Sequence, residues 1–218
     1  IKSIKLKDFF CNIIVGITIT QTLTMNTDNE LQIKNRGTGA GGANTNAKGK
    51  TFEEETSNEH RLLENGFTKT KYTLEKDNIS EKISYVSQGS LKKYMKEKYG
   101  KTLFRNPDEA YIIEYPDGRK PHLLILEKKA QNVAGSVDTK LLAGPLFREE
   151  YELSLDNEFR VQYAFCVSSF LQRYIESDKT KWVIFNKLME KHEIPILFGD
   201  SPDYFSTLDA WISKYARQ

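Results

Sequence analysis

A strong turn signal near the middle of the chain most constrains its fold. Residues 116–119, with sequence PDGR, combine a proline, an aspartate and a glycine in an order typical of a tight reverse turn. Strand-like runs rich in aliphatic and aromatic residues lie on both sides of this turn. The segment therefore predicts a β-hairpin whose second strand, ending in Ile125 and Leu126, is buried.

The hairpin brings two acidic residues together. If the turn is centred on its Asp-Gly bond, Asp108 lies directly opposite Glu127, with Cβ atoms about 5 Å apart. Lys129 follows two residues later and therefore lies on the same face, whereas Lys128 points to the opposite face. A register shift of one residue would break this pairing.

This set of side chains is suited to phosphodiester hydrolysis. Two facing carboxylates repel each other unless a cation lies between them, and hard oxygen ligands suit Mg²⁺. The metal can polarise a phosphate and lower the pKa of a bound water, and a neighbouring lysine can stabilise charge on the phosphate. We expect Asp108 and Glu127 to bind Mg²⁺ beside Lys129. The alternative is a solvated acidic pair on the hairpin.

Pro107-Asp108 followed by Glu127-x-Lys129 at the end of a hairpin resembles the motif of the PD-(D/E)XK nucleases. Together with segments 41–46 and 49–53, which are similar to parts of some type II restriction endonucleases, the resemblance covers roughly residues 37–155. It implies a restriction-endonuclease-like core with the catalytic Asp, Glu and Lys on neighbouring strands between helices. Some members also place a glutamate of the first core helix near the metal, which makes Glu53 a candidate ligand; alternatively, Glu53 only stabilises a helix N-terminus.

The resemblance implies a sequence-specific endonuclease that cuts double-stranded DNA with Mg²⁺, as in restriction-modification systems. A homodimer follows from it, because cutting both strands requires two active sites and a twofold dimer suits a palindromic site. Two alternatives remain open: a repair or transposase-like nuclease with the same core and no sequence specificity, and an inactive nucleic-acid-binding module.

Basic and amide side chains near the Gly/Asn-rich stretch and beyond the catalytic strand are candidates for DNA contacts, because such groups bind phosphates and base edges. They are Arg36, Asn44, Asn46, Lys48, Lys50, Gln131 and Lys140. Simple disorder of the stretch is the alternative. With a net charge of only +2, any DNA-binding face must be a local concentration of basic residues.

The remaining titratable residues suggest structural roles. Asp117 is expected to stabilise the turn, and His122 is expected on the surface of its strand rather than as a general base. Neither cysteine belongs to a CxxC or Cys/His cluster, which argues against a zinc site and against a disulfide scaffold. We expect an intracellular, cytoplasmic protein that does not bind a membrane.

Residues 1–24 are predicted to form an N-terminal extension of uncertain status. A short basic start precedes an apolar run with the outline of a signal peptide, although the run is too short to span a membrane. Alternatively, the natural start is Met25. Residues 25–218 are expected to form one nuclease domain that begins with a Gly/Asn-rich loop, 25–50.

The order of the other expected elements predicts an α/β (α+β) fold with a mixed central sheet flanked by helices. Helices are predicted over 51–66, 91–99, 139–155, 169–175, 181–191 and 204–215. Strands, besides the hairpin, are predicted over 68–74, 83–86, 160–168 and 194–198.

Overall fold

The structure, a computed structural model, describes the backbone of residues 42–131 and 137–216. It describes the side chains of the same residues except 42–48 and 138. All of these residues lie in one compact unit. The predicted extension 1–24 and the first part of the predicted loop lie outside the described residues.

A seven-stranded mixed sheet forms the centre of the fold, and its strands lie side by side in sequence order. The strands are β1 (Thr68–Lys69), β2 (Leu74–Asp77), β3 (Lys82–Ser87), β4 (Glu109–Glu114), β5 (His122–Lys129), β6 (Arg160–Val167) and β7 (Ile196–Phe198). The pairs from β1 to β5 are antiparallel, whereas β5, β6 and β7 are parallel. This confirms the predicted α/β class with a mixed sheet.

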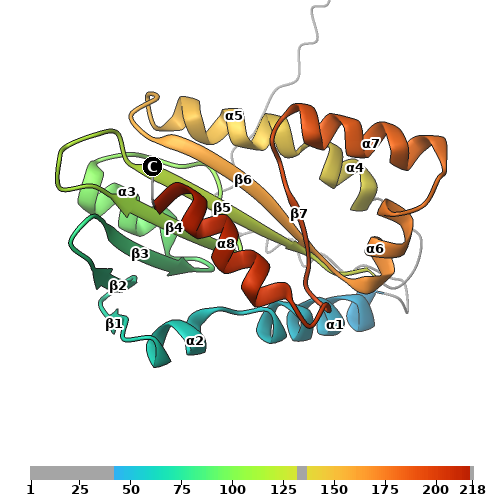
Figure 1. Cartoon of the computed structure of the whole chain (residues 1–218), viewed down its shortest axis with the longest axis horizontal. Helices are drawn as coiled ribbons and strands as arrows, with labels where there is room; N and C mark the ends of the chain where they lie inside the picture. Colours follow the sequence, from blue (N-terminus) through green and yellow to red (C-terminus); the bar gives the residue numbers. More distant parts are fainter. Residues whose placement is uncertain (1–41, 132–136, 217–218) are drawn as a thin grey trace, which may run out of the picture. The chain divides into compact units, whose positions relative to one another are not determined.

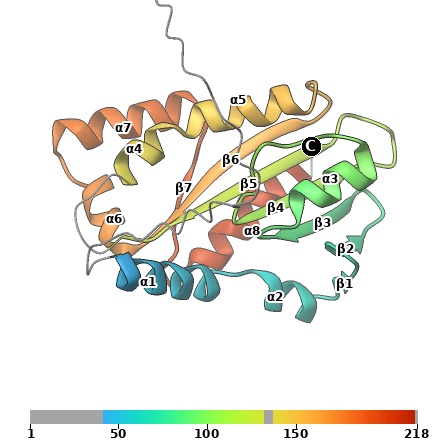
Figure 2. The same cartoon turned by 180° about the vertical axis from the view of Figure 1, so that it is seen from behind.

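Helices cover both faces of the sheet (Figures 1 and 2). The α8 face is covered by α1 (Gly42–Glu55), α2 (Glu59–Glu64) and α8 (Tyr204–Ala216). The α3 face is covered by α3 (Leu91–Tyr99), α4 (Val137–Leu142), α5 (Gly144–Ser154), α6 (Ser169–Ile175) and α7 (Thr180–Lys191). The two parallel connections, β5 to β6 and β6 to β7, therefore both run over the α3 face.

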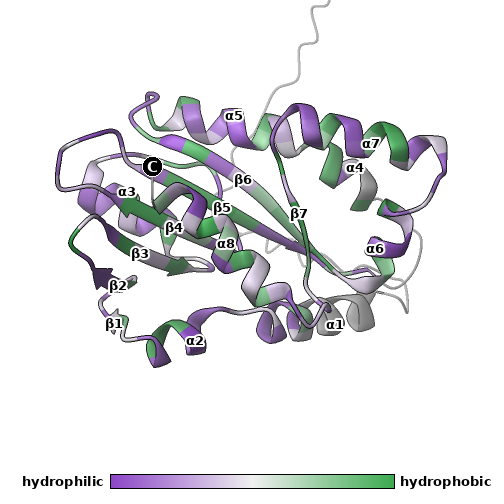
Figure 3. Cartoon of the chain, viewed as in Figure 1, coloured by the Kyte–Doolittle hydropathy of each residue, from purple (hydrophilic) through white to green (hydrophobic). Residues whose placement is uncertain are grey.

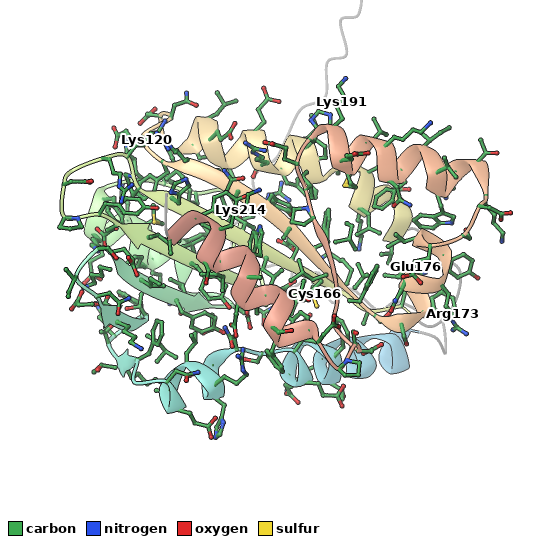
Figure 4. The ribbon with its side chains drawn as sticks, viewed as in Figure 1. Lys120, Cys166, Arg173, Glu176, Lys191 and Lys214 are labelled. Carbon is green, nitrogen blue, oxygen red and sulfur yellow. The ribbon has the colours of Figure 1, made fainter. Side chains whose placement is uncertain are left out.

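Strand alternation divides the apolar residues between two cores, one on each face. On β5, Leu123 and Ile125 pack into the α3 face, while Leu124 and Leu126 pack into the α8 face. Figure 3 shows hydrophobic colour over the middle of β4 and β5 and hydrophilic colour at the end of β5. Cys166, labelled in Figure 4, is fully buried in the α8-face core and is a free cysteine. A strand buried on both faces is a rigid support for side chains at its end.

The predicted hairpin and its register are confirmed. Glu109 pairs with Leu126 and Ile113 pairs with His122, which is the register that places residue 108 opposite residue 127. In the turn, the backbone N–H of Gly118 donates to the carbonyl of Tyr115 at 3.2 Å, and Gly118 has φ 76°. Such a conformation favours glycine, which explains how the turn fixes the register.

The Gly/Asn-rich segment differs from the prediction where the structure describes it. Residues 42–50 are helical and form the first part of α1, so a loop over 25–50 is wrong for these residues. Helix propagation is less costly than nucleation, and the helical segment anchored by the buried Phe52 extends backwards through Ala43, Ala47 and Lys48. The predicted helix 51–66 is also interrupted, because the chain leaves α1 after Glu55 and α2 begins at Glu59.

Two further predicted elements are divided in the structure. The expected helix 139–155 is split into α4 and α5 at Ala143, because Pro145 in the first turn of α5 has no N–H to continue a helix. The expected strand 68–74 contains a turn, in which the N–H of Thr70 bonds to the carbonyl of Thr73 at 2.8 Å. The other predicted helices and strands agree with the structure to within two residues.

His122 is a further correction, because it is buried, with 2% of its surface exposed. Its Nδ1 lies 2.8 Å from the hydroxyl of Tyr115, which donates to the carbonyl of Tyr215 at 2.6 Å. Because the Tyr115 hydroxyl donates its proton to Tyr215, it must accept the hydrogen bond from His122. The neutral imidazole of His122 therefore carries its proton on Nδ1. The chain folds α8 over this end of the hairpin, and no local sequence pattern shows that contact.

Candidate active site

The candidate site lies at the edge of the sheet where β4 begins and β5 ends. Asp108 immediately precedes β4, and Glu127 and Lys129 are in the last three residues of β5. The parallel strands β6 and β7 end at the same edge, since Lys129 pairs with Val167 and Val167 with Phe198. Each predicted catalytic side chain is therefore held by a regular, buried strand or by the residue next to it.

The three side chains predicted from the hairpin converge. Lys129 Nζ lies 2.7 Å from Glu127 Oε2 and 3.6 Å from Asp108 Oδ2. The exposed fractions of the side chains are 22% for Lys129, 15% for Glu127 and 14% for Asp108. Asp108 Oδ2 also accepts a hydrogen bond from the backbone N–H of Lys128 at 2.6 Å. The site is partly shielded from water and yet open at the sheet edge.

The two carboxylates disfavour each other's charge. Burial raises the pKa of Glu127, and the charge of Asp108 and a hydrogen bond with it raise this pKa further, while Lys129 acts in the opposite direction. Burial also opposes the charge of Lys129, but the attraction of Glu127 and Asp108 outweighs burial and raises the pKa of Lys129. A lysine ammonium therefore stays charged between two carboxyl groups, which carry excess negative charge when both are ionised.

Glu53, the candidate from the first helix, lies in the electrostatic field of the same site. Burial raises the pKa of its carboxyl, the charge of Asp108 raises it further, and Lys129 and Lys128 lower it. Glu53 and Asp108 line one cavity of about 180 Å³, together with Lys128 and Gln88. Helix α1 therefore places the Glu53 side chain close to Asp108, at the start of β4.

Within the described residues, no group of three or more His, Cys, Asp or Glu side chains is arranged to hold a metal ion. The donor set nevertheless fits Mg²⁺ chemically, because Asp108 and Glu127 offer hard carboxylate oxygens whose mutual repulsion a cation relieves. Glu53 is the nearby third carboxylate. Asp108 and Glu127 could hold a divalent ion if Lys129 gave up part of its present contact.

The residues predicted to contact DNA differ in their exposure. Lys50 on α1 and Lys140 on α4 are exposed, and Lys50 lies 3.9 Å from Glu54. Gln131 lies beyond the end of β5 and is only 8% exposed; its backbone bonds to the hydroxyl of Ser168 in both directions at 3.3 Å. The position of Arg36 and the side chains of Asn44, Asn46 and Lys48 lie outside the described residues.

Two tyrosines near the site are absent from the prediction. Tyr163 on β6 pairs with Ile125, and Tyr151 on α5 packs in the same core. Burial is the main cause that raises the pKa of both phenols, and the charge of Glu127 is the next cause. Neither hydroxyl has a hydrogen-bond partner among the described residues. The parallel β5–β6 pairing that brings them to Glu127 is long-range, and only the apolar composition of β6 pointed to that strand.

A larger cavity of about 620 Å³ lies elsewhere, between α5 and α7. Its lining includes Leu146, Arg148, Leu188 and His192. None of the candidate catalytic residues lines it, so its size does not make it the active site. The geometry at the end of β5 is the better guide to chemistry.

No protein-family model matches the chain, and neither curated proteins nor solved structures show a significant match to it. Over the part of the chain that the structure describes, no helix combines the length and apolar character needed to cross a bilayer.

Proposed function

We propose that this protein is a Mg²⁺-dependent endonuclease that cuts double-stranded DNA at a short specific sequence, with a core of the PD-(D/E)XK, restriction-endonuclease-like type. The observation that carries the proposal is the convergence of Asp108, Glu127 and Lys129 at adjacent ends of one hairpin. This convergence gives a phosphodiesterase the groups it needs on rigid strands.

Each residue has a distinct role in the proposed hydrolysis. Asp108 and Glu127 would hold Mg²⁺ through carboxylate oxygens, and Glu53 would be a further ligand from α1. The bound ion supplies charge neutralisation at the phosphate and a lowered pKa for the attacking water. Lys129 orients that water or donates to a phosphate oxygen as charge develops there. Water loses a proton and adds to phosphorus, one phosphorus–oxygen bond of the DNA strand breaks, and the leaving oxygen takes a proton from solvent, so the products are one phosphate end and one hydroxyl end.

Two copies of the chain are proposed to act together. The described residues of one chain contain one such site, and cutting both antiparallel strands of a duplex at one locus requires two sites. A twofold homodimer on a palindromic sequence meets this need. Lys50 and Lys140, which are exposed on α1 and α4, are the described basic candidates for DNA contacts.

Plasmid cleavage tests the proposal. Wild-type protein should cut with Mg²⁺ and not with EDTA, and Asp108→Ala or Lys129→Ala should abolish cutting. Asp117→Ala is a matched control, because Asp117 also follows a proline but lies exposed in the turn. Full cleavage by either active-site variant would show that the assignment is wrong.

The ends of the DNA fragments distinguish the proposal from its alternatives. Discrete, mapped ends on long DNA support a sequence-specific enzyme. Random ends support the non-specific repair or transposase-like nuclease. Metal-independent binding without cutting supports an inactive nucleic-acid-binding module.

A further inference from the structure

A second ion pair lies directly behind the candidate active site, on the α8 face of the sheet. Glu109 follows Asp108, and Lys128 lies between Glu127 and Lys129, so strand alternation points both side chains away from the catalytic face. Lys128 Nζ is 2.8 Å from Glu109 Oε1, and the side chains are 2% and 3% exposed. Two apolar residues are often as stable as a buried ion pair, so stability alone does not account for this one.

Lys128 also reaches helix α1. Its Nζ donates to the backbone carbonyl of Glu53 at 3.1 Å. Glu53 is in the last turn of α1, where carbonyls have no partner within the helix and where a positive charge is favoured by the helix dipole. Lys128 therefore fastens the end of α1 to β5 through the residue whose carboxylate shares a cavity with Asp108.

Glu109 binds the segment between α1 and α2 through hydrogen bonds. Its Oε1 accepts from the backbone N–H of Asn58 at 3.2 Å and from the hydroxyl of Tyr85 at 3.1 Å. Its Oε2 accepts from the hydroxyl of Tyr111 at 3.2 Å, which in turn accepts from Asn58 Nδ2 at 3.0 Å. Both carboxylate oxygens are thus satisfied, and the charge can be buried because the network is complete.

We propose that Lys128 and Glu109 form a positioning pair, which fixes the last turn of α1 against the ends of β4 and β5 and so holds the carboxylate of Glu53 beside Asp108 for cation binding. Both residues act through Glu53. The identity of the bound cation rests on the proposed nuclease function. The fixing of α1 does not, because it depends only on contacts within the protein.

A charge-free double variant separates this role from stability. Removing one partner alone leaves a buried, unpaired charge and risks unfolding, whereas Lys128→Met with Glu109→Met removes both charges. The matched control is Lys98→Met with Glu114→Met, which removes a 2.6 Å ion pair at the other end of β4. Hydrogen exchange of the amides of residues 49–55 reports on α1, and the electron paramagnetic resonance signal of free Mn²⁺ reports on cation affinity.

The expected result is faster exchange in α1 and Mn²⁺ affinity lower by roughly ten- to 100-fold in Lys128→Met/Glu109→Met, with folding retained. The control pair should change neither measurement. If the double variant exchanges its α1 amides at the wild-type rate, the proposal is wrong. It is also wrong if the double variant exchanges faster but binds Mn²⁺ with unchanged affinity. If the wild-type protein binds no Mn²⁺, the cation site of the proposed function fails, while α1 exchange still decides whether the pair fixes the helix.

Discussion

Lys129 Nζ lies 2.7 Å from Oε2 of Glu127, the carboxylate two residues earlier on the same face of β5. The same ammonium lies 3.6 Å from Asp108 Oδ2. When both carboxyl groups are ionised, one positive charge faces two negative charges, and an excess of negative charge remains at the sheet edge. A divalent cation can neutralise this excess, which makes the response of the site to Mg²⁺ measurable in the folding equilibrium as well as in catalysis.

Replacing Lys129 by methionine should increase the stabilisation that Mg²⁺ gives. The two carboxylates then lose the cation between them, so the variant should melt lower than the wild type in EDTA and recover more in excess Mg²⁺. An ion present at 100 times its Kd stabilises the folded state by about 2.7 kcal/mol. Melting temperatures with and without Mg²⁺ test this, with the exposed Lys120→Met as control. Equal Mg²⁺ responses in wild type and Lys129→Met would contradict it.

Glu53→Gln should weaken Mg²⁺ binding at the site without abolishing cleavage. Its carboxylate reaches the site from α1, and the amide is a weaker, uncharged ligand. The Mg²⁺ concentration for half-maximal cleavage should rise by on the order of tenfold, or about 1.4 kcal/mol of binding. Glu55→Gln, an exposed residue of the same helix that does not line the cavity, is the matched control and should keep the wild-type Mg²⁺ curve. An unchanged curve for Glu53→Gln would remove Glu53 from the metal site.

The hairpin part of the site could be predicted from sequence because the information is local. A proline, an aspartate and a glycine set the turn, the turn sets the register, and the register places Asp108 opposite Glu127. Strand alternation then separates Lys129 from Lys128 without further information, and the structure places Lys128 on the opposite face with Glu109.

The rest of the site depends on contacts between distant segments. Tyr163 comes near Glu127 only through the parallel pairing of β5 with β6, and the link between Lys128 and Glu53 joins residues 75 positions apart. The break at Ala143 was in principle visible, because Gly144-Pro145 marks a helix interruption. The helical start of α1 could not be predicted from the sequence, because glycine and asparagine lower helix propensity and this segment has no apolar periodicity.

Gly199→Ala should disturb the seating of α1. A Cβ atom at Gly199 would lie 2.5 Å from the ring of Phe52 and 2.8 Å from Cys166 Sγ, and both neighbours are buried. Overpacking of this kind costs about 1–3 kcal/mol, and displacement of Phe52 should also lower cleavage because Glu53 is next to it.

Gly49→Ala, a substitution within α1 itself, should stabilise the protein instead. A Cβ there meets nothing within 4 Å, and alanine in a helix is favoured over glycine by about 0.5–1 kcal/mol. Urea unfolding should therefore show a lower midpoint for Gly199→Ala and a higher one for Gly49→Ala. A Gly199→Ala protein as stable and active as the wild type would contradict the packing of α1 described above.

His122 should make folding stability depend on pH below neutrality. Burial, followed by the charges of Arg160 and Arg119, lowers the pKa of His122 from 6.5 to about 4. Between these values the unfolded chain binds a proton that the folded chain does not bind, so stability is complete above the unfolded pKa and decreases as the pH falls toward 4. The loss attributable to His122 is about 3 kcal/mol across this range.

Urea unfolding of wild type and His122→Gln at several pH values isolates this loss of stability, because glutamine can donate to Tyr115 but does not titrate. The variant should lose less stability than the wild type on acidification, while the exposed His60→Gln should follow the wild type. Parallel pH curves for wild type and His122→Gln would show that the buried imidazole is not the titrating group.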